Sequence, residues 1–429
     1  MKYLPFITIP AKQIVLLLII TCAGCIVSRA QISGIQWQKC LGGSSAEAPY
    51  SIIQTHDGGY AVAGLTKSND GDVTGYHGSV LGSFLGDVWV VKLDSTGSIE
   101  WQKALGGTKD DAGFSIQQTT DGGYIVAGIT GSSDGDVTGM HDSGLVNSSD
   151  CWVVKLDSNG SIIWNKALGG SYREYGRSIR QTFDGGYIVA CSSSSSDGDV
   201  TGHHVGYSAD VSTTYDFWIV KLNDTGGVIW NKSLGGTRDD QAFSIQQTSD
   251  SGYIVIGITN SNNGDVTGCH YGADSSAYDY WIIKLNDTGG VVWQKTLGGT
   301  AIDLGVDVIQ TFDGGFIVSG RTISSDGDVI GYHEGTGADP LYDAWILKLN
   351  SSGGIVWQST PGDNNWDGFT SVCQTADSGF IAAGWINWFP WIVKYTKNGV
   401  VSYQKRIAYD PGWNNITPVC VTSDGGYVI

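Results

Sequence analysis

The chain has 429 residues, including 63 glycines, and a formal net charge of −18 at pH 7. This length is sufficient for a sizeable core, and the glycine content fits a fold built from many tight turns. An acidic surface repels nucleic acid and anionic lipid, so neither is an expected partner, whereas it favours solubility and cation binding.

Residues 1–30 differ in composition from the rest. Two lysines precede a short apolar run, Ile14 to Ile20, and small residues stand at Ser28 and Ala30. This pattern predicts a secretory signal peptide cleaved after Ala30, because the apolar run is too short to span a membrane. Lipidation of Cys25, which follows Ala and Gly as in part of a lipobox, is the alternative.

Residues 31–429 form a repeat, and residues 87–128 show its unit. That stretch holds four short runs rich in Val, Ile and Trp (VWVVKL, SIEWQKAL, SIQQT and YIVAGIT) separated by glycine-bearing turns. Such runs predict antiparallel hairpins, and four strands per unit are typical of a β-propeller blade. We name the strands of a blade A (SIQQT), B (YIVAG), C (WVVKL) and D (WQKAL). A turn aspartate separates A from B at Asp57, Asp121, Asp184, Asp250, Asp313, Asp377 and Asp424.

The number of repeats sets the expected number of blades. Five full units are followed by a shortened sixth, about 369–407, and by a seventh that begins near Ile416. An isolated WQK strand at residues 34–43 precedes the first unit, so we expect this N-terminal strand to close the ring. The sequence therefore predicts a seven-bladed propeller truncated in its last blade. Eight blades are the alternative if another repeat lies beyond Ile429.

Twelve of the 16 tryptophans occupy two repeat positions, one in strand C and one in strand D. Because buried aromatic side chains contribute strongly to core packing, we interpret these twelve as contacts between units. The cysteines stand mostly at unrelated repeat positions and form no CxxC pair, so neither a disulfide framework nor a zinc site is predicted.

The loops of one face are the expected location of function. In an up-and-down blade the B→C and D→A connections emerge on the same face, and here they are long and irregular, whereas the A→B and C→D turns are tight. Binding residues commonly stand on such loops of a rigid scaffold.

The B→C loops of the first five blades carry a D-G-D motif, which is N-G-D at Asn263 in the fourth, followed by a histidine. Paired aspartates can supply oxygen ligands to Ca²⁺, whereas the same residues also cap turns without a metal. We therefore keep both interpretations, an Asx-turn and a calcium site. The candidate ligands are Asp70, Asp72, Asp134, Asp136, Asp197, Asp199, Asp326 and Asp328.

The D→A loops place one acidic residue ten positions before each of the first six turn aspartates. By symmetry these residues are expected to form a ring at the mouth of the central channel, where like charges raise one another's pKa or recruit a cation. The alternative is that each carboxylate binds backbone amides. The six residues are Glu47, Asp111, Glu174, Asp240, Asp303 and Asp367.

Four tryptophans lie outside the two repeat positions, namely Trp366, Trp385, Trp388 and Trp413. They fall in and around the sixth unit, whose D-G-D loop is replaced by WINWFP, and are expected to emerge together on the loop face. Clustered aromatic side chains can stack on sugar rings or anchor a protein partner. Packing into the space of the lost loop is the alternative.

The repeat, YIVAG with DGDVTG-x-H followed by WVVKLD, WQK and LGG, resembles a family of bacterial secreted propellers, many of which end in a type IX sorting domain. The resemblance covers residues 34–429 and implies a propeller fold and export. The hairpin KLDSTGSIEW also resembles the docking repeat of quinoprotein-like propellers, which we interpret as shared blade architecture.

We find no HExxH or phosphate-loop motif, and we identify no candidate catalytic residue. We expect a secreted or cell-surface, monomeric, non-catalytic propeller that binds a glycan or a surface protein through the loop face. The alternatives are a polysaccharide-active hydrolase or lyase, and a scaffold for a catalytic domain beyond Ile429.

Overall fold

The computed structural model describes residues 35–78, 86–141, 144, 148–204, 214–270, 277–333, 341–407 and 418–429. The predicted signal peptide, including Cys25, lies outside the described residues, as does Trp413.

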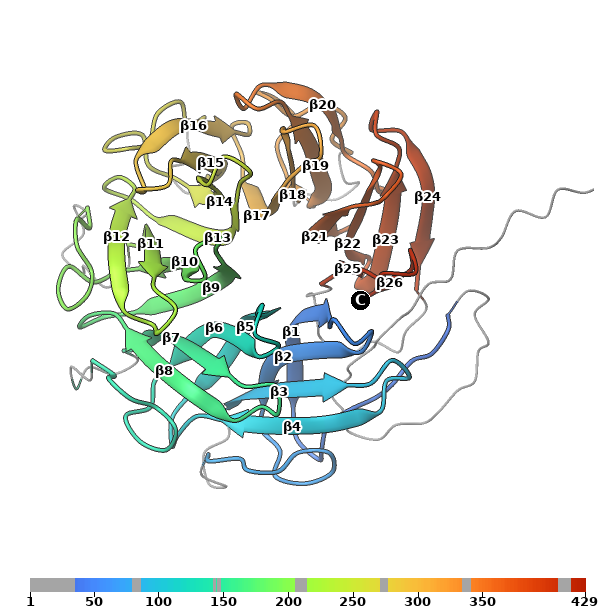
Figure 1. The fold of residues 1–429 in the computed structure, drawn as a ribbon. Helices are drawn as coiled ribbons and strands as arrows, with labels where there is room; N and C mark the ends of the chain where they lie inside the picture. The colour runs from blue at the N-terminus through green and yellow to red at the C-terminus, as the bar shows by residue number, and fades with distance from the viewer. Residues whose placement is uncertain are drawn as a thin grey trace, which may run out of the picture.

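Six four-stranded antiparallel sheets surround a common axis as the blades of a β-propeller (Figure 1). In each blade the strands pair in chain order, with the first strand innermost and the fourth outermost. Blade one comprises β1 (Glu47–Gln54), β2 (Tyr60–Thr66), β3 (Asp87–Leu93) and β4 (Ile99–Leu105). Blade two comprises β5 (Asp111–Gln118), β6 (Tyr124–Thr130), β7 (Asp150–Leu156) and β8 (Ile162–Leu168). Blade three comprises β9 (Glu174–Gln181), β10 (Tyr187–Ser193), β11 (Asp216–Leu222) and β12 (Val228–Leu234).

The second half of the ring repeats this plan. Blade four comprises β13 (Asp240–Gln247), β14 (Tyr253–Thr259), β15 (Asp279–Leu285) and β16 (Val291–Leu297). Blade five comprises β17 (Asp303–Gln310), β18 (Phe316–Thr322), β19 (Asp343–Leu349) and β20 (Ile355–Ser359). Blade six comprises β21 (Asp367–Gln374), β22 (Phe380–Ile386), β23 (Phe389–Tyr395) and β24 (Val401–Arg406).

The predicted number of seven blades is wrong, because the structure has six. The seventh turn aspartate, Asp424, belongs to a two-stranded sheet of β25 (Cys420–Val421) and β26 (Tyr427–Val428), which lies between blade six and blade one (Figure 1). Tyr427 packs with Ile381 of blade six, and Val428 packs with the core of blade one. A copy of the turn therefore indicates a hairpin but does not by itself make a four-stranded blade.

The predicted N-terminal closing strand is also not observed, since residues 36–46 belong to no strand. Trp37 nevertheless packs edge-on against Tyr60, with ring centroids 5.4 Å apart. A Cβ atom on Gly97 would lie 2.9 Å from the Trp37 ring. These are the contacts that the strand D tryptophans make elsewhere, so a side chain can occupy the repeat's packing position without the strand's hydrogen bonds.

The hydrophobic core lies between blades. One cluster combines Val88 and Val90 of blade one with Tyr124 and Trp152 of blade two, and further clusters join the later blades in the same way. Strands B and C are buried over nearly their whole length, whereas strand D is only partly buried. A blade therefore buries its apolar faces only by stacking on its neighbours, as in other repeat folds.

The two repeated tryptophans hold this interface, as predicted. The strand C tryptophan is buried in every blade, and Trp218 donates its indole N–H to Asn231 Oδ1 at 3.1 Å. The strand D tryptophan packs on the next blade. Trp101 lies edge-on to Tyr124 at 5.5 Å, and its indole nitrogen donates to the Ser158 carbonyl at 3.1 Å. A Cβ atom at Gly160 would lie 2.8 Å from Trp101, so this turn position requires glycine.

The A→B turns are held by a buried lysine. In blade two, Thr119 Oγ1 and the Gly123 amide both donate to Asp121 Oδ1, and Lys155 Nζ lies 2.9 Å from Asp121 Oδ2. Burial alone would raise the pKa of Asp121, but the hydrogen bonds from Thr119 and Lys155 bring it to about 2. The TxDGG turn and the lysine of WVVKL are therefore one structural unit.

Two cysteine thiols meet at the interface of blades two and three. Cys151 on β7 and Cys191 on β10 are fully buried, and their sulfur atoms lie 3.1 Å apart. Burial raises the pKa of the Cys191 thiol well above its ordinary value. Their unrelated repeat positions concealed this contact in the sequence.

No helix among the described residues is long and apolar enough to cross a membrane.

We expect Trp218→Ala to lower the free energy of unfolding by about 3–5 kcal/mol, because it removes a fully buried aromatic side chain and leaves a cavity between blades. Phe183→Ala is the control, since Phe183 is exposed in a turn, and should change stability by about 0.5 kcal/mol or less. Urea unfolding followed by tryptophan fluorescence measures both. Equal effects of the two changes would contradict the interface model.

Candidate functional site

The D-G-D loops bind the backbone of the loop that enters the same blade. In blade one, Asp70 Oδ1 accepts the Ser44 amide at 2.7 Å, and Asp72 Oδ2 accepts the Gly42 amide at 3.0 Å. Gly71 between them has φ of +65°, and a Cβ atom there would lie 2.3 Å from the Gly42 carbonyl oxygen. The motif is thus a turn that fastens two loops of one blade. The same bonds recur at Asp134 and Asp136, Asp197 and Asp199, Asn263 and Asp265, and Asp326 and Asp328.

Within the parts of the chain that the structure describes, no group of three or more His, Cys, Asp or Glu side chains is placed to hold a metal ion. The calcium site remains a prediction.

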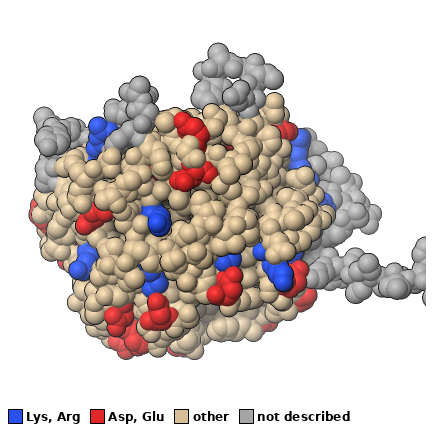
Figure 2. Space-filling model, turned by 90° about the horizontal axis from the view of Figure 1, so that it is seen from above, with Lys and Arg blue, Asp and Glu red and all other residues tan. Residues whose placement is uncertain are grey.

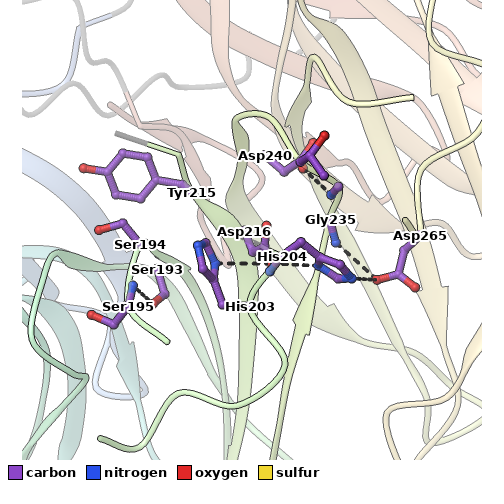
Figure 3. A network of polar contacts seen from close by, with 12 residues as sticks. Ser193, Ser194, Ser195, His203, His204, Tyr215, Asp216, Gly235, Asp240 and Asp265 are labelled. Atoms are coloured by element: carbon purple, nitrogen blue, oxygen red, sulfur yellow. Dashed lines mark hydrogen bonds and ion pairs between the residues drawn. The ribbon is translucent and has the colours of Figure 1, made fainter. Parts of the chain in front are cut away.

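Four of the five histidines after these loops join two blades, as blade three shows (Figure 3), whereas His333 pairs with Asp343 of its own blade. The Nδ1 atom and backbone amide of His204 lie 2.9 and 2.8 Å from Asp216 Oδ2, and its Nε2 atom lies 3.7 Å from Asp265 Oδ2 of blade four. The hydrogen bond with Asp216 raises the pKa of His204. His77, His141 and His270 form equivalent bridges to the following blade.

The sequence analysis missed the buried aspartates that bind these histidines. They are the first residues of the C strands, Asp87, Asp150, Asp216, Asp279 and Asp343, and none is more than 1% exposed. A fixed D-x-W pattern in these strands was the available signal.

The predicted acidic ring is buried in the loop face. Asp240 accepts hydrogen bonds from the Gly236 amide at 2.7 Å, from Ser261 Oγ at 2.8 Å and from Thr259 Oγ1. The other five also accept backbone amides, and all six are at most 1% exposed. None of the six lines the central cavity described below. These bonds are the arrangement of the amide-binding alternative.

Burial raises the pKa of five of these six carboxyls. It raises the pKa of Glu174, Asp240 and Asp303 to about 7 despite their hydrogen bonds. It likewise raises the pKa of Asp111 to about 6 and that of Asp367 to about 8.

Three of the four additional tryptophans come together on blade six, and we call Trp366, Trp385 and Trp388 the tryptophan cluster. The rings of Trp366 and Trp388 stack with centroids 5.6 Å apart and planes 22° apart, and those of Trp385 and Trp388 at 6.1 Å and 13°. Trp388 is 49% exposed and Trp366 38% exposed, whereas Trp385 is 3% exposed. The cluster thus holds two partly exposed indole rings and a buried third ring, whereas Trp413 lies outside the described residues.

Local backbone geometry presents these rings. Asn387 and Trp388 form a two-residue turn between the paired residues Ile386 and Phe389, with φ of 50° and 66°. A bulky residue at positive φ is rare and costs about 1–3 kcal/mol. The Asn387 amide donates to the Trp366 carbonyl at 2.7 Å, which fixes the turn to the neighbouring loop.

A central cavity of about 510 Å³ adjoins the cluster, since Trp366 and Trp385 line both. The innermost strands of all six blades supply most of its other walls, and Ile258, Arg321, Tyr342 and Pro418 supply the rest. In each of these strands the register with strand B shifts at one residue, a β-bulge that redirects the side chain. The bulged residues are Tyr50, Phe114, Arg177, Phe243, Val306 and Thr370, and all line the cavity.

Sequence reasoning did not find this set, although each member stands seven residues before a turn aspartate. The residue type varies from blade to blade, and a bulge has no fixed composition. The side chains that the bulges direct into the cavity therefore differ in chemical type from one blade to the next.

Charged side chains of both signs are scattered over a largely uncharged surface in side view (Figure 2). Eleven of the 42 acidic residues, namely the acidic ring and the histidine-binding aspartates, are buried.

The structure defines the chain as a β-propeller of repeated four-stranded blades. No protein-family model matches it. The regulatory protein FlaEY of Caulobacter vibrioides is 22% identical over 390 residues, which span 79% of this chain but 39% of that protein.

Solved structures also resemble the chain at low identity. The WD40 domain of Neurospora crassa Pan2 aligns with a TM-score of 0.47 and 9% identity over 88% of this chain and 84% of that one. A Bacteroides caccae protein of unknown function aligns with a TM-score of 0.42 and 12% identity over 75% and 90%. These similarities concern the fold alone.

We expect the thermal midpoint to fall as the pH rises from 5 to 8. The unfolded chain ionises its carboxyls near pH 4, whereas Glu174, Asp240 and Asp303 stay protonated in the folded protein up to about pH 7. The folded state therefore binds more protons in this window, so its stability decreases with rising pH. His204, whose pKa is also raised, acts in the same direction.

Differential scanning calorimetry at constant ionic strength measures this slope. Asp240→Asn should reduce the slope, because the asparagine cannot ionise. A midpoint that is constant or rises between pH 5 and 8 would contradict the assignment.

Proposed function

We propose that this protein is a non-catalytic binding propeller that recognises a glycan through the tryptophan cluster, and that it acts outside the cell or on the outer cell surface. The observation that supports binding is the pair of exposed, nearly parallel indole rings of Trp366 and Trp388 over the buried Trp385. Large exposed apolar surfaces are uncommon on monomeric proteins and mark binding sites.

The shape of the cluster favours a sugar ring as its ligand. The C–H face of a pyranose is flat and apolar and can pack on an indole face, while its hydroxyl groups point sideways toward polar neighbours. The Arg321 guanidinium, 6.0 Å from the Trp385 ring, and Tyr342, 5.7 Å from the Trp366 ring, lie beside the cluster.

Backbone strain at the turn supports a binding role over simple packing. Packing into the space of a lost loop does not require a tryptophan at positive φ, because a glycine would adopt that conformation freely. Retention of Trp388 at φ of 66° with half its surface exposed is instead typical of a residue kept for its contacts with a ligand.

The polysaccharide-active enzyme gains no support from the cavity. A glycosidase needs two carboxyl groups flanking the scissile bond, whereas Asp307 is the one carboxylate among the described residues that line the cavity. Asp367, the carboxylate nearest the cluster in sequence, is buried and accepts the Ala344 and Asp363 amides.

We expect Trp366→Ala combined with Trp388→Ala to weaken glycan binding about tenfold or more, equivalent to at least about 1.4 kcal/mol. A glycan array with purified protein identifies the ligand, and isothermal titration calorimetry measures the change. Phe312→Ala is the matched control, because Phe312 is an exposed aromatic residue in an A→B turn on the opposite face. Glycan binding that the tryptophan changes leave unaffected would refute the proposal. Binding to a protein but to no glycan would show that the ligand is a protein. Repeating the titration with a calcium chelator tests the calcium prediction.

Trp388→Gly should separate binding from stability. Glycine relieves the positive φ, which offsets the packing lost with a half-exposed ring, so the free energy of unfolding should stay within about 1 kcal/mol of wild type. Glycan affinity should fall as for the alanine variant. Thermal unfolding and calorimetric titration of the same sample give both values. A large loss of stability would show that Trp388 serves packing.

A further inference from the structure

The central cavity contains an arginine with no acidic partner. Arg177 is the only charged residue among the six bulged residues that line the cavity. Its guanidinium carbon lies 4.9 Å from the Phe114 ring centre, 5.0 Å from that of Tyr175 and 5.7 Å from that of Phe243. Among the described residues it forms no ion pair or hydrogen bond, and its Nε atom is buried without an acceptor.

Such a group is costly without a ligand. Burial lowers the pKa of Arg177, but an arginine side chain keeps its proton at neutral pH, so the cavity retains a positive charge. The three aromatic rings compensate for part of the lost hydration through cation–π attraction. They leave the buried Nε–H group without the acceptor that a buried polar group normally has.

Positively charged side chains outnumber negatively charged ones in the lining of the cavity. Its lining includes Arg177, Arg180 and Arg321 against Asp307 alone. The Asp307 carboxylate is already engaged, because it accepts Ser244 Oγ at 2.8 Å and the Val308 and Val372 amides at 3.0 and 2.9 Å. In a chain of net charge −18 this is a local reversal of sign.

The other two arginines of the cavity, Arg180 and Arg321, differ in their hydrogen bonds. Arg180 donates to Ser115 Oγ at 3.2 Å and to the Ile179 carbonyl at 2.7 Å, so it is fixed in the wall. Arg321 is partly engaged, since it has a side-chain hydrogen bond with Tyr342 and its guanidinium lies 5.0 Å from that ring, whereas its Nε atom is buried without an acceptor. Arg321 also lies near Trp385, which connects the cationic part of the cavity to the tryptophan cluster.

We propose that the central cavity binds the carboxylate of a ring-bearing ligand, with Arg177 pairing with the carboxylate and the aromatic walls packing against the ring. A guanidinium donates two parallel hydrogen bonds to a carboxylate, which matches the unused donors of Arg177. The cavity, at about 510 Å³, is in the range of small-molecule sites. The identification of this ring as a sugar rests on the proposed function. A uronic acid unit of the glycan carries both the sugar ring and the carboxylate.

The test compares glucuronate with glucose, which has the same ring without the carboxylate. Saturation-transfer NMR and calorimetric titration at fixed ionic strength measure binding to the full chain. We expect glucuronate to bind at least about tenfold more tightly than glucose, because only glucuronate can pair with Arg177. Arg177→Gln should abolish this preference, and Arg177→Lys should retain part of it because the charge remains.

Arg406→Gln is the matched control, since Arg406 also stacks on an aromatic ring, 3.8 Å from the Phe389 centroid, but lies outside the cavity lining. It should leave the preference unchanged. Thermal unfolding of Arg177→Gln should match or exceed wild type, because the change removes an unpaired charge, and this establishes that the variant folds.

Equal affinities for glucose and glucuronate, no binding of either, or a preference that survives Arg177→Gln would overturn the inference. Binding of inorganic phosphate in place of glucuronate would also overturn it, because the site would then recognise a different anion. Arg177-dependent glucuronate binding without any effect of the Trp366 and Trp388 changes on glycan affinity would refute the proposed function and leave the cavity site standing. Loss of glycan affinity in the tryptophan variants together with equal binding of the two sugars would do the reverse.

Discussion

The contact between neighbouring blades is the interaction on which the whole structure depends. A single four-stranded sheet has apolar side chains on both faces and cannot bury them alone. The strand D tryptophan crosses to the next blade, where it packs on an aromatic residue such as Tyr124 and on a glycine turn such as Gly160. The five interfaces between consecutive blades repeat the packing of the strand D tryptophan on an aromatic residue, whereas the hairpin of β25 and β26 lies between blade six and blade one.

Much of the acidity of the chain belongs to this framework. The D-G-D aspartates bind amides of the entering loop, the ring carboxyls bind amides and hydroxyls within the loop face, and a second set of buried aspartates binds the histidines that bridge blades. The acidic residues that recur at fixed positions in the repeat therefore accept hydrogen bonds, mainly from backbone amides that no strand pairing satisfies. The composition suggested cation binding, which stays a prediction, and the geometry shows that these oxygens accept hydrogen bonds from the protein itself.

The exceptions to the repeat gather around the axis and on blade six. The cavity residues vary because the bulge positions make no contact that the repeat requires, so their chemistry is free to differ between blades. Blade six has lost its long loop, and its short turn holds Trp388 in a strained conformation beside Trp366. The arginines of the cavity and the tryptophans of blade six adjoin one another through Arg321 and Trp385, which makes one continuous surface of two features that are distant in the sequence.

The sequence by itself determined the four-stranded unit, the turns and the two tryptophan positions, because strand periodicity and glycine turns are local properties. Three of the four additional tryptophans, Trp366, Trp385 and Trp388, lie together on blade six as predicted. The sequence did not determine the number of blades, since a turn motif such as that at Asp424 is local, whereas a blade needs four paired strands. Only the tertiary structure could show the meeting of Cys151 with Cys191, the burial of the acidic ring and the unpaired Arg177, because each depends on which side chains adjacent blades bring together. The burial of a side chain and its hydrogen-bond partners depend on the neighbouring blade. The sequence of one repeat does not show which side chains that neighbour places across the interface.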